Sequence, residues 1–315
     1  MKLHESKKEF NELTQLTSVY KGIPEIAIKK DYLICMILEK LSCCENVGHC
    51  VFKGGTSLSK CYPGSIDRFS EDIDLTYIPI EGASKKQINN ELKKLERELI
   101  GQLQHESINS ERSDKNKSSY VWMDLVGAKE IGIKLEIGAV VRPAPYEMKP
   151  LKTYIQEFLE SQQLDSVLKE YDLVEFSINV LDIRRTFIDK LLAVKRHTIC
   201  GTINKKVRHI YDVKRLLERQ DVQMFLEDLD ELKRIIRLTK ETDIEYLKKR
   251  TLTADYDPLG EFDFNSWKKA FSDSEIKARY ESLQDDLLYT NEKQDFSEAI
   301  VAFEKINDIF SKIEE

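Results

Sequence analysis

The sequence predicts a mixed α/β domain followed by a mostly helical lobe. Alternating apolar residues indicate strands between the helical segments of the first part, whereas everything after Arg184 is helical in pattern. A length of 315 residues is sufficient for two hydrophobic cores. We therefore expect a domain with a mixed β-sheet flanked by helices in residues 1–183, and a helical C-terminal domain in residues 184–315.

The elements of the first domain are expected in a defined order. Residues 5–20 and 24–46 are typical of helices, and Pro24 suits the start of the second one. Val51 and Phe52 lead into a glycine pair, after which residues 56–61 favour a short helix. The remaining expected elements are a strand over 72–80, an amphipathic helix over 84–103, a polar loop over 109–119, strands over 120–125, 131–141 and 174–180, and an irregular loop around the prolines at 143, 145 and 150.

The composition is that of a soluble globular protein. Hydrophobic residues make up 41% of the chain and charged residues 33%. No apolar run approaches the roughly 20 residues that span a bilayer, and the polar first ten residues do not resemble a secretory signal. We therefore expect a cytoplasmic protein that has no membrane partner.

The six cysteines contain no Cys-x-x-Cys pair. A zinc site within the segment from Cys43 to Cys50, together with His49, is one interpretation. The other is that these are ordinary reduced cysteines packed in or near helices, and we favour it because the histidine spacing of a zinc site is missing.

Two short motifs lie close together in the first domain. They are Lys53-Gly54-Gly55-Thr56-Ser57-Leu58-Ser59-Lys60 and Arg68-Phe69-Ser70-Glu71-Asp72-Ile73-Asp74-Leu75. Side chains alternate along a strand, so Asp72 and Asp74 point to the same side. Two carboxylates this close repel each other unless a cation lies between them, and oxygen ligands are the ones that Mg²⁺ prefers. Since the Gly-Gly-Thr turn offers backbone and hydroxyl groups to phosphates, the two motifs together predict a nucleoside triphosphate site.

This arrangement resembles the nucleotidyltransferase superfamily related to DNA polymerase β, whose signature is a Gly-Gly or Gly-Ser turn followed by Asp-x-Asp. It is more closely similar to the AbiEii/MenT-type toxin nucleotidyltransferases of bacterial toxin–antitoxin and phage-defence systems. The resemblance extends to the segments from Thr186 to Ala193 and from Arg208 to Val213, and so covers about two thirds of the chain. It implies an NTP substrate, Mg²⁺ with two ions possible, and a cognate antitoxin.

Three carboxylates are candidate metal ligands in this site. Asp72 and Asp74 would hold Mg²⁺ and act as catalytic residues, although two exposed carboxylates at the end of a strand are the plain alternative. Glu136 is the third candidate, because nucleotidyltransferases of this superfamily often place a third acid on a neighbouring strand. Lys134 shares the face of Glu136, however, so an ordinary surface ion pair is the other interpretation of that glutamate.

The nucleotide-binding candidates come from the same two motifs. Gly54, Gly55 and Thr56 would cradle the β- and γ-phosphates, and Arg68 would support them. Ser70 shares the face of the two aspartates. In some of the resembling toxins the antitoxin is a kinase that phosphorylates a serine at this position, and a phosphate there would compete with the nucleotide. Further helpers, each of which could instead be a solvated surface charge, are Lys53 and Lys60.

Two further catalytic candidates lie in the second domain. Lys190 is surrounded in sequence by apolar residues, and the resembling toxins require a lysine in this helix, which implies a role on the triphosphate. The alternative is a lysine that snorkels at the helix edge. Asp212 matches a fourth position of the family pattern, where it would orient Lys190, add to the metal shell or pair with Arg208.

The net charge of −7 is unevenly distributed. Residues 184–219 contain eleven Lys and Arg against three acids, which is a local footprint of the kind that binds phosphate backbones. By resemblance the acceptor is the 3′ end of tRNA, and this basic window is where an acceptor stem would lie. A pair of solvated helix faces is the alternative.

The sequence thus predicts a toxin that transfers a nucleoside monophosphate from NTP to the 3′ end of tRNA, releases pyrophosphate and blocks translation. Two alternatives stay open from the sequence: transfer to a protein hydroxyl, and a nucleotide-binding regulatory subunit with little turnover.

Overall fold

The computed structural model describes residues 1–123, 131–247, 255–289 and 292–314. The chain divides into two compact units, and both are discontinuous in sequence. The first unit comprises Met1–Cys61 and Phe69–Leu181, and the second comprises Tyr62–Arg68 and Asp182–Glu315. The predicted domain boundaries, 1–183 and 184–315, stay a prediction. No feature of the sequence sets the segment Tyr62–Arg68 of the second unit apart from its neighbours in the chain.

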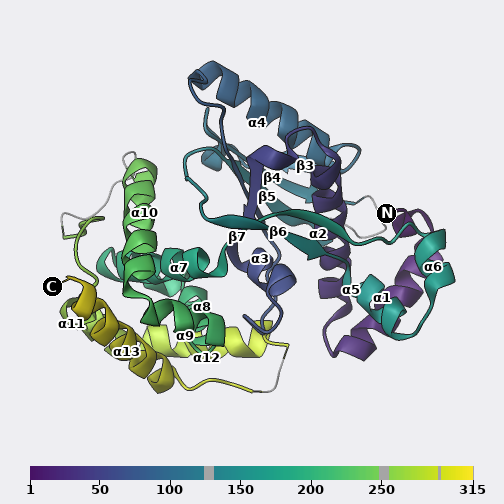
Figure 1. Cartoon of the computed structure of the whole chain (residues 1–315). Helices are drawn as coiled ribbons and strands as arrows, with labels where there is room; N and C mark the ends of the chain where they lie inside the picture. The colour runs from purple at the N-terminus through teal and green to yellow at the C-terminus, as the bar shows by residue number, and fades with distance from the viewer. Residues whose placement is uncertain (124–130, 248–254, 290–291, 315) are drawn as a thin grey trace. The chain divides into compact units, whose positions relative to one another are not determined.

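A seven-stranded mixed sheet forms the centre of the first unit, in the order β3-β4-β5-β2-β1-β7-β6 (Figure 1). The pairs β2–β5 and β1–β7 are parallel, and the other neighbours are antiparallel. This confirms the predicted mixed α/β class. The strands are β1 Cys50–Lys53, β2 Ile73–Tyr77, β3 Gln104–Ser107, β4 Asn116–Trp122, β5 Ile133–Gly138, β6 Tyr146–Leu151 and β7 Phe176–Leu181.

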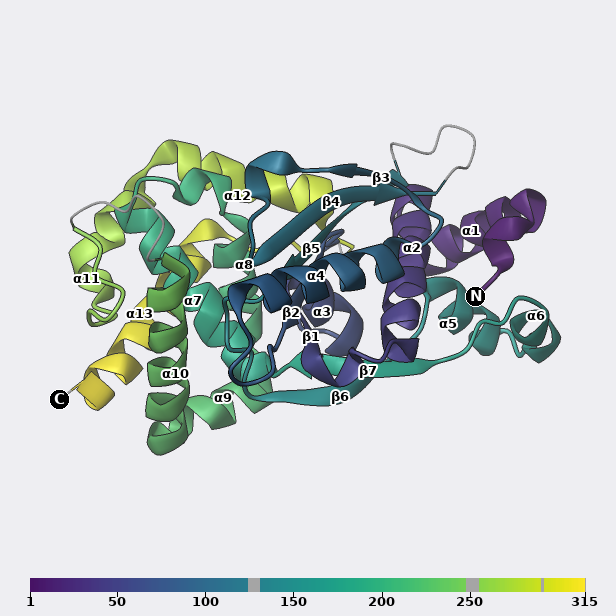
Figure 2. The same cartoon turned by 90° about the horizontal axis from the view of Figure 1, so that it is seen from above.

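Helices α2 (Glu25–Cys43) and α4 (Lys85–Ile100) pack against each other and against this sheet; Figure 2 shows α4 lying along β4 and β5. The predicted apolar stripe of α4 is in the core, because Leu92, Leu95 and Leu99 are fully buried. A capping box at Ser84 begins the helix. The other helices of the unit are η1 Leu3–Glu5, α1 Lys7–Lys21, η2 Val47–His49, α3 Gly54–Cys61, η3 Asn109–Glu111, α5 Tyr154–Ser161 and α6 Asp165–Glu170.

The structure corrects the sequence at three strands. The segment around Pro150 is not an irregular loop but β6, which lies at an edge of the sheet, where a proline costs no inner ladder hydrogen bond. The opposite edge strand, β3, is exposed along its whole length and lacks the apolar alternation that marks a strand. Strand β4 begins at Asn116, inside the predicted polar loop, and the end of the predicted strand over 120–125 lies outside the described residues.

The second unit is helical in the part of the chain that the structure describes (Figure 1). An aromatic cluster that includes Phe262, Phe264, Trp267, Phe303 and Phe310 forms one part of its core. Its elements are α7 Ile183–Ile199, η5 Ile203–Lys205, α8 Arg208–Leu217, α9 Gln220–Glu227, α10 Leu229–Leu247, α11 Phe264–Trp267, η6 Lys268–Ser272, α12 Ser274–Leu287 and α13 Phe296–Glu314. None of the described helices in either unit has the length and apolar character to cross a membrane.

Candidate active site

Asp74 lies in the middle of the sheet, on the side opposite to its buried neighbours Ile73 and Leu75. It is paired in register with Lys53 on β1 and with Glu136 on β5. Directly paired residues of adjacent strands present their side chains on the same face. One row across three strands therefore carries a lysine, the aspartate and the glutamate that the sequence proposed as a third acid.

The glycine turn packs directly against Asp74. Gly54 has a φ of +87°, and a Cβ added to it would lie only 2.3 Å from Asp74 Oδ2. A side chain at this position would have to displace the carboxylate, and the left-handed backbone would be strained as well. Glycine is thus required here because the acidic side chain occupies the space that a side chain would fill. Helix α3 begins at this same residue, so Gly54 and Gly55 form its first turn.

Two hydrogen bonds hold the segment that carries Asp72, which lies just before the first residue of β2. The buried Thr56 hydroxyl donates to the Asp72 carbonyl oxygen at 2.5 Å and lies 3.0 Å from Ser70 Oγ. On the other side, Glu71 forms an ion pair with Lys30 of α2. Thr56 therefore ties α3 to the acidic motif, and its predicted contact with phosphate stays a prediction.

The residues at this site fit a magnesium ion. Asp72 and Asp74 supply oxygen donors only, and the Gly54 backbone leaves room for the Asp74 carboxylate to lie against the helix turn. Within the described parts of the chain, no three His, Cys, Asp or Glu side chains converge to form a complete metal cage. Proteins commonly hold Mg²⁺ by one or two carboxylates and leave the other positions to water and substrate phosphates.

Glu136 is already engaged in an ion pair. Its Oε2 lies 2.9 Å from Lys134 Nζ, and the same ammonium lies 2.6 Å from Glu111 Oε2. The ion pair with Lys134, which the sequence left open as the other interpretation of Glu136, is therefore present. Glu136 also lies beside Asp74 on the neighbouring strand. Sequence reasoning missed Glu111 because it lies in a loop segment far from both motifs.

The second group of predicted site residues lies in the second unit. Arg68 donates two hydrogen bonds to Asp212, from Nε at 2.6 Å and from Nη2 at 2.7 Å. Lys190 Nζ donates to Asp212 Oδ2 at 2.6 Å. All three side chains are buried, with exposures of 2%, 0% and 6%. Lys190 is therefore not a snorkelling lysine, and the partners of Asp212 include Arg68 and Lys190, which matches the proposed role of orienting the lysine.

The charges in this group are set by burial and by each other. Burial alone would raise the pKa of Asp212, but Arg68 and Lys190 outweigh it and hold that pKa below its ordinary value. Burial lowers the pKa of Lys190, and Asp212 opposes that shift. Next to Asp212 in space, His209 has a pKa that burial and Lys190 hold well below 6.5, so its ring is neutral at pH 7.

His209 is a residue whose surroundings the sequence did not reveal. Its Nδ1 atom is buried and has no hydrogen-bond partner within the described residues. Such atoms are rare in folded proteins, and this one lies one helical turn before Asp212 on α8.

Comparison with known proteins identifies the family. The chain matches the family model described as nucleotidyl transferase AbiEii toxin, type IV toxin–antitoxin system, over residues 37–302. This chain belongs to the AbiEii family.

Among solved structures, the toxin is similar to MenT4, a nucleotidyltransferase toxin from Mycobacterium tuberculosis H37Rv. The identity is 18% and the TM-score 0.52, over 95% of this chain and 98% of that one. It is also similar to JHP933 from Helicobacter pylori, with 17% identity and a TM-score of 0.39, over 93% of this chain and 99% of that one. No curated protein matches. At such identities the likeness to MenT4 shows the fold.

Family membership confirms the resemblance drawn from the two motifs. The toxin is a nucleotidyltransferase, and its family implies an antitoxin partner. The interpretation as a regulatory subunit without turnover is not favoured, because the family is described by its transferase activity.

The predicted helper Lys60 belongs to the interior of the first unit. Its ammonium lies 2.5 Å from Asp31 Oδ1, donates to the Lys152 carbonyl at 2.8 Å and lies 3.9 Å from the centre of the Tyr154 ring. Lys60 and Asp31 are 4% and 2% exposed. This lysine therefore anchors α3 to α2 and to the start of α5.

We expect Lys60→Met to destabilise the toxin by about 3–5 kcal/mol, because it leaves Asp31 buried without its cation. The double variant Asp31→Asn with Lys60→Met should recover part of that loss, since the uncompensated charge is gone. Urea unfolding of the three proteins checks this. Equal midpoints for the parent and Lys60→Met would show that the pair contributes nothing to stability.

Most of the basic window is paired within the fold. At least seven of its eleven cations form ion pairs with acids, and Lys195 donates to the carbonyls of Gly260 and Glu261. The seven are Arg184, Arg185, Lys190, Arg196, Lys214, Arg215 and Arg219. Lys205 is exposed at the turn before α8. Fewer of these cations are thus unengaged by acids than the charge count suggests, and the exposed Lys205 is the candidate for contact with a phosphate backbone.

The six cysteines are free thiols. Burial raises the pKa of Cys50 and Cys61 to about 12 in each case, so both stay protonated. His49 Nδ1 lies 3.2 Å from the Ile78 carbonyl oxygen. These observations favour reduced structural cysteines over the zinc alternative.

Proposed function

We propose that this toxin transfers a nucleoside monophosphate from NTP to the 3′ end of tRNA in a Mg²⁺-dependent reaction, and so inhibits translation. The acceptor hydroxyl gives up its proton to solvent and its oxygen forms a bond to the α-phosphorus, the bond from that phosphorus to the bridging oxygen breaks, and pyrophosphate leaves. The observation that carries the proposal is the packing of the Asp74 carboxylate against the Gly54 backbone, which places an acid at the first turn of α3.

In this proposal Asp72 and Asp74 hold the ion, which offsets negative charge on the triphosphate when it is bound. Gly54 and Gly55 present the first backbone amides of α3 to the phosphates. Thr56 fixes the position of Asp72 through the backbone. Ser70, the remaining nucleotide-binding candidate, shares that hydrogen-bonded segment.

Lys190 supplies the ammonium that neutralises charge on the departing pyrophosphate. Asp212 holds this ammonium in one orientation and opposes the lowering of its pKa by burial. Arg68 fixes Asp212 in turn through two parallel hydrogen bonds. The sequence proposes that Arg68 supports the phosphates; its guanidinium is buried on Asp212, so in this proposal it acts through that carboxylate.

Incubating the toxin with α-³²P-labelled NTPs, total tRNA and total protein tests the proposal. We expect label in the tRNA fraction, dependence on Mg²⁺ and no label with Asp74→Asn. Label in a protein band instead would support the alternative acceptor, a protein hydroxyl. Label in neither fraction, with every NTP tried, would contradict the proposed transfer.

The exposed Lys205 should bind the acceptor rather than the nucleotide. We expect Lys205→Glu to weaken tRNA binding several-fold and to reduce its salt dependence, because fewer counterions are released. Nucleotide affinity should stay unchanged. Lys86→Glu is the matched control, since it makes the same charge change at an exposed position of α4. If both variants bind tRNA alike, the turn before α8 is not part of the acceptor site.

A further inference from the structure

An ammonium group lies beside the acidic row of the sheet. Lys134 Nζ contacts Glu111 Oε2 at 2.6 Å and Glu136 Oε2 at 2.9 Å at the same time. Glu136 is in register with Asp74 on the neighbouring strand. Lys134 lies two residues earlier on β5, so its side chain is on the same face as Glu136.

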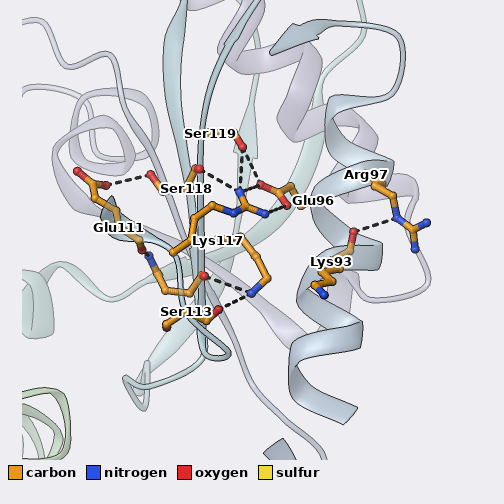
Figure 3. Close-up of polar contacts among 10 residues, drawn as sticks. Lys93, Glu96, Arg97, Glu111, Ser113, Lys117, Ser118 and Ser119 are labelled. Atoms are coloured by element: carbon orange, nitrogen blue, oxygen red, sulfur yellow. Dashed lines mark hydrogen bonds and ion pairs between the residues drawn. The ribbon is translucent and has the colours of Figure 1, made fainter. Parts of the chain in front are cut away.

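Glu111 and Glu136 together form a clamp around the Lys134 ammonium. Glu111 is held in place by its own contacts. Ser118 Oγ of β4 donates to Glu111 Oε2 at 2.9 Å, a contact visible in Figure 3. Next to Glu111, Arg112 forms a bidentate ion pair with Glu96 of α4, at 2.6 and 2.7 Å, and donates to the Ser118 carbonyl. The 3₁₀ turn that carries Glu111 is thereby tied to both β4 and α4 (Figure 3).

Two carboxylates from different elements, Glu111 of η3 and Glu136 of β5, hold the Lys134 ammonium between them. Since the ammonium touches both carboxylates together, shifting it fully onto Glu111 would still leave it close to Glu136. A divalent ion bound by Glu136 would therefore lie next to a fixed positive charge, which is unfavourable.

We propose that Lys134 takes the place of a second metal ion. Asp72 and Asp74 then hold a single ion in the nucleotide complex, Glu136 stays outside the metal shell, and the Lys134 ammonium supplies the other positive charge of the site. This inference rests on the proposed nucleotidyl transfer, and it makes Lys134 and Glu111 positioning residues of that reaction.

Counting bound Mn²⁺ by electron paramagnetic resonance, with the full chain and an NTP analogue that has an uncleavable α,β-bridge, tests this. We expect one ion per chain in the parent and two in Lys134→Met, because the substitution frees Glu136 as a ligand. Lys134→Arg and Glu136→Gln should each bind one. The matched control is Lys149→Met, which breaks a lysine–glutamate pair on the edge strand β6 and should also bind one.

Two ions in the parent, or one ion in a folded Lys134→Met, would overturn the proposal. Circular dichroism of each variant establishes that it is folded. Failure of the proposed function gives a different result: no nucleotide-dependent Mn²⁺ binding in any of the proteins, which removes the basis of this inference too.

Discussion

Asp74→Asn should abolish nucleotidyl transfer while leaving the fold intact. Asparagine has the shape of aspartate and still fits against Gly54, but it lacks the charge that the metal ion requires. Loss of a residue that merely supports a metal ligand costs about 10–100-fold, so loss of a direct ligand should cost at least about a hundredfold. Asp72→Asn should behave in the same way. Initial rates of label transfer from NTP measure the effect.

The urea midpoint of Asp74→Asn should stay near that of the parent, since this side chain is only half-buried and points away from the core. Glu81→Gln is the control, because it neutralises an exposed carboxylate beyond the end of β2. It should retain normal turnover. Near-normal turnover in Asp74→Asn would rule out the metal site.

The second large effect separates catalysis from stability within the buried group of the second unit. Lys190→Met removes one cation from Asp212 and leaves the bidentate pair with Arg68. We expect stability within about 1 kcal/mol of the parent, because a buried charge is replaced by an apolar side chain of similar length. Activity should fall by about 10²–10³-fold, the size of effect seen when one preorganised charge-stabilising donor is lost.

Asp212→Asn should lower stability as well as activity, because Asp212 also orients Lys190. It removes the carboxylate that Arg68 and Lys190 share, so the free energy of unfolding should drop by about 3–5 kcal/mol.

Lys190→Arg should be more active than Lys190→Met but less active than the parent, because a guanidinium has a different shape from an ammonium. Urea unfolding and label transfer are measured on the same preparations. A Lys190→Met protein that is as unstable as Asp212→Asn would make the lysine structural.

The sequence alone was sufficient to predict the features that depend on residues close together in the chain. The two motifs, the helix α4 and the mixed sheet are all encoded within short segments whose periodicity or spacing can be read directly. The family match over residues 37–302 confirms what those segments indicated. Edge strands escaped prediction, since β3 is fully exposed and β6 contains Pro150, and neither has the apolar alternation of an inner strand.

Long-range charge pairing could be predicted only in part: the resemblance indicated, among other roles, that Asp212 orients Lys190, which it contacts, but it did not indicate the partners of Arg68 and Lys60. From the sequence, Arg68 of the acidic motif was expected to support the phosphates, and Lys60 to be either a helper or a solvated surface charge. Arg68 instead bonds to a carboxylate 144 residues away, and Lys60 is buried with Asp31 from an earlier helix. A buried ion pair leaves no periodic signal, because only the fold decides which carboxylate a cation meets.

The discontinuous second unit has a consequence for how the toxin is made. Its segment Tyr62–Arg68 leaves the ribosome early, but the partner of Arg68 follows 144 residues later. At about 5–20 residues per second, this is a delay of roughly 7–30 s. During that interval the nascent chain contains the complete acidic motif. Asp212, which binds Arg68 at the start of that motif, has not yet been synthesised. A chain that ends at residue 181 would therefore not be an independent catalytic module. A reporter of folding during synthesis should detect the complete fold only after the C-terminal helices have emerged from the ribosome.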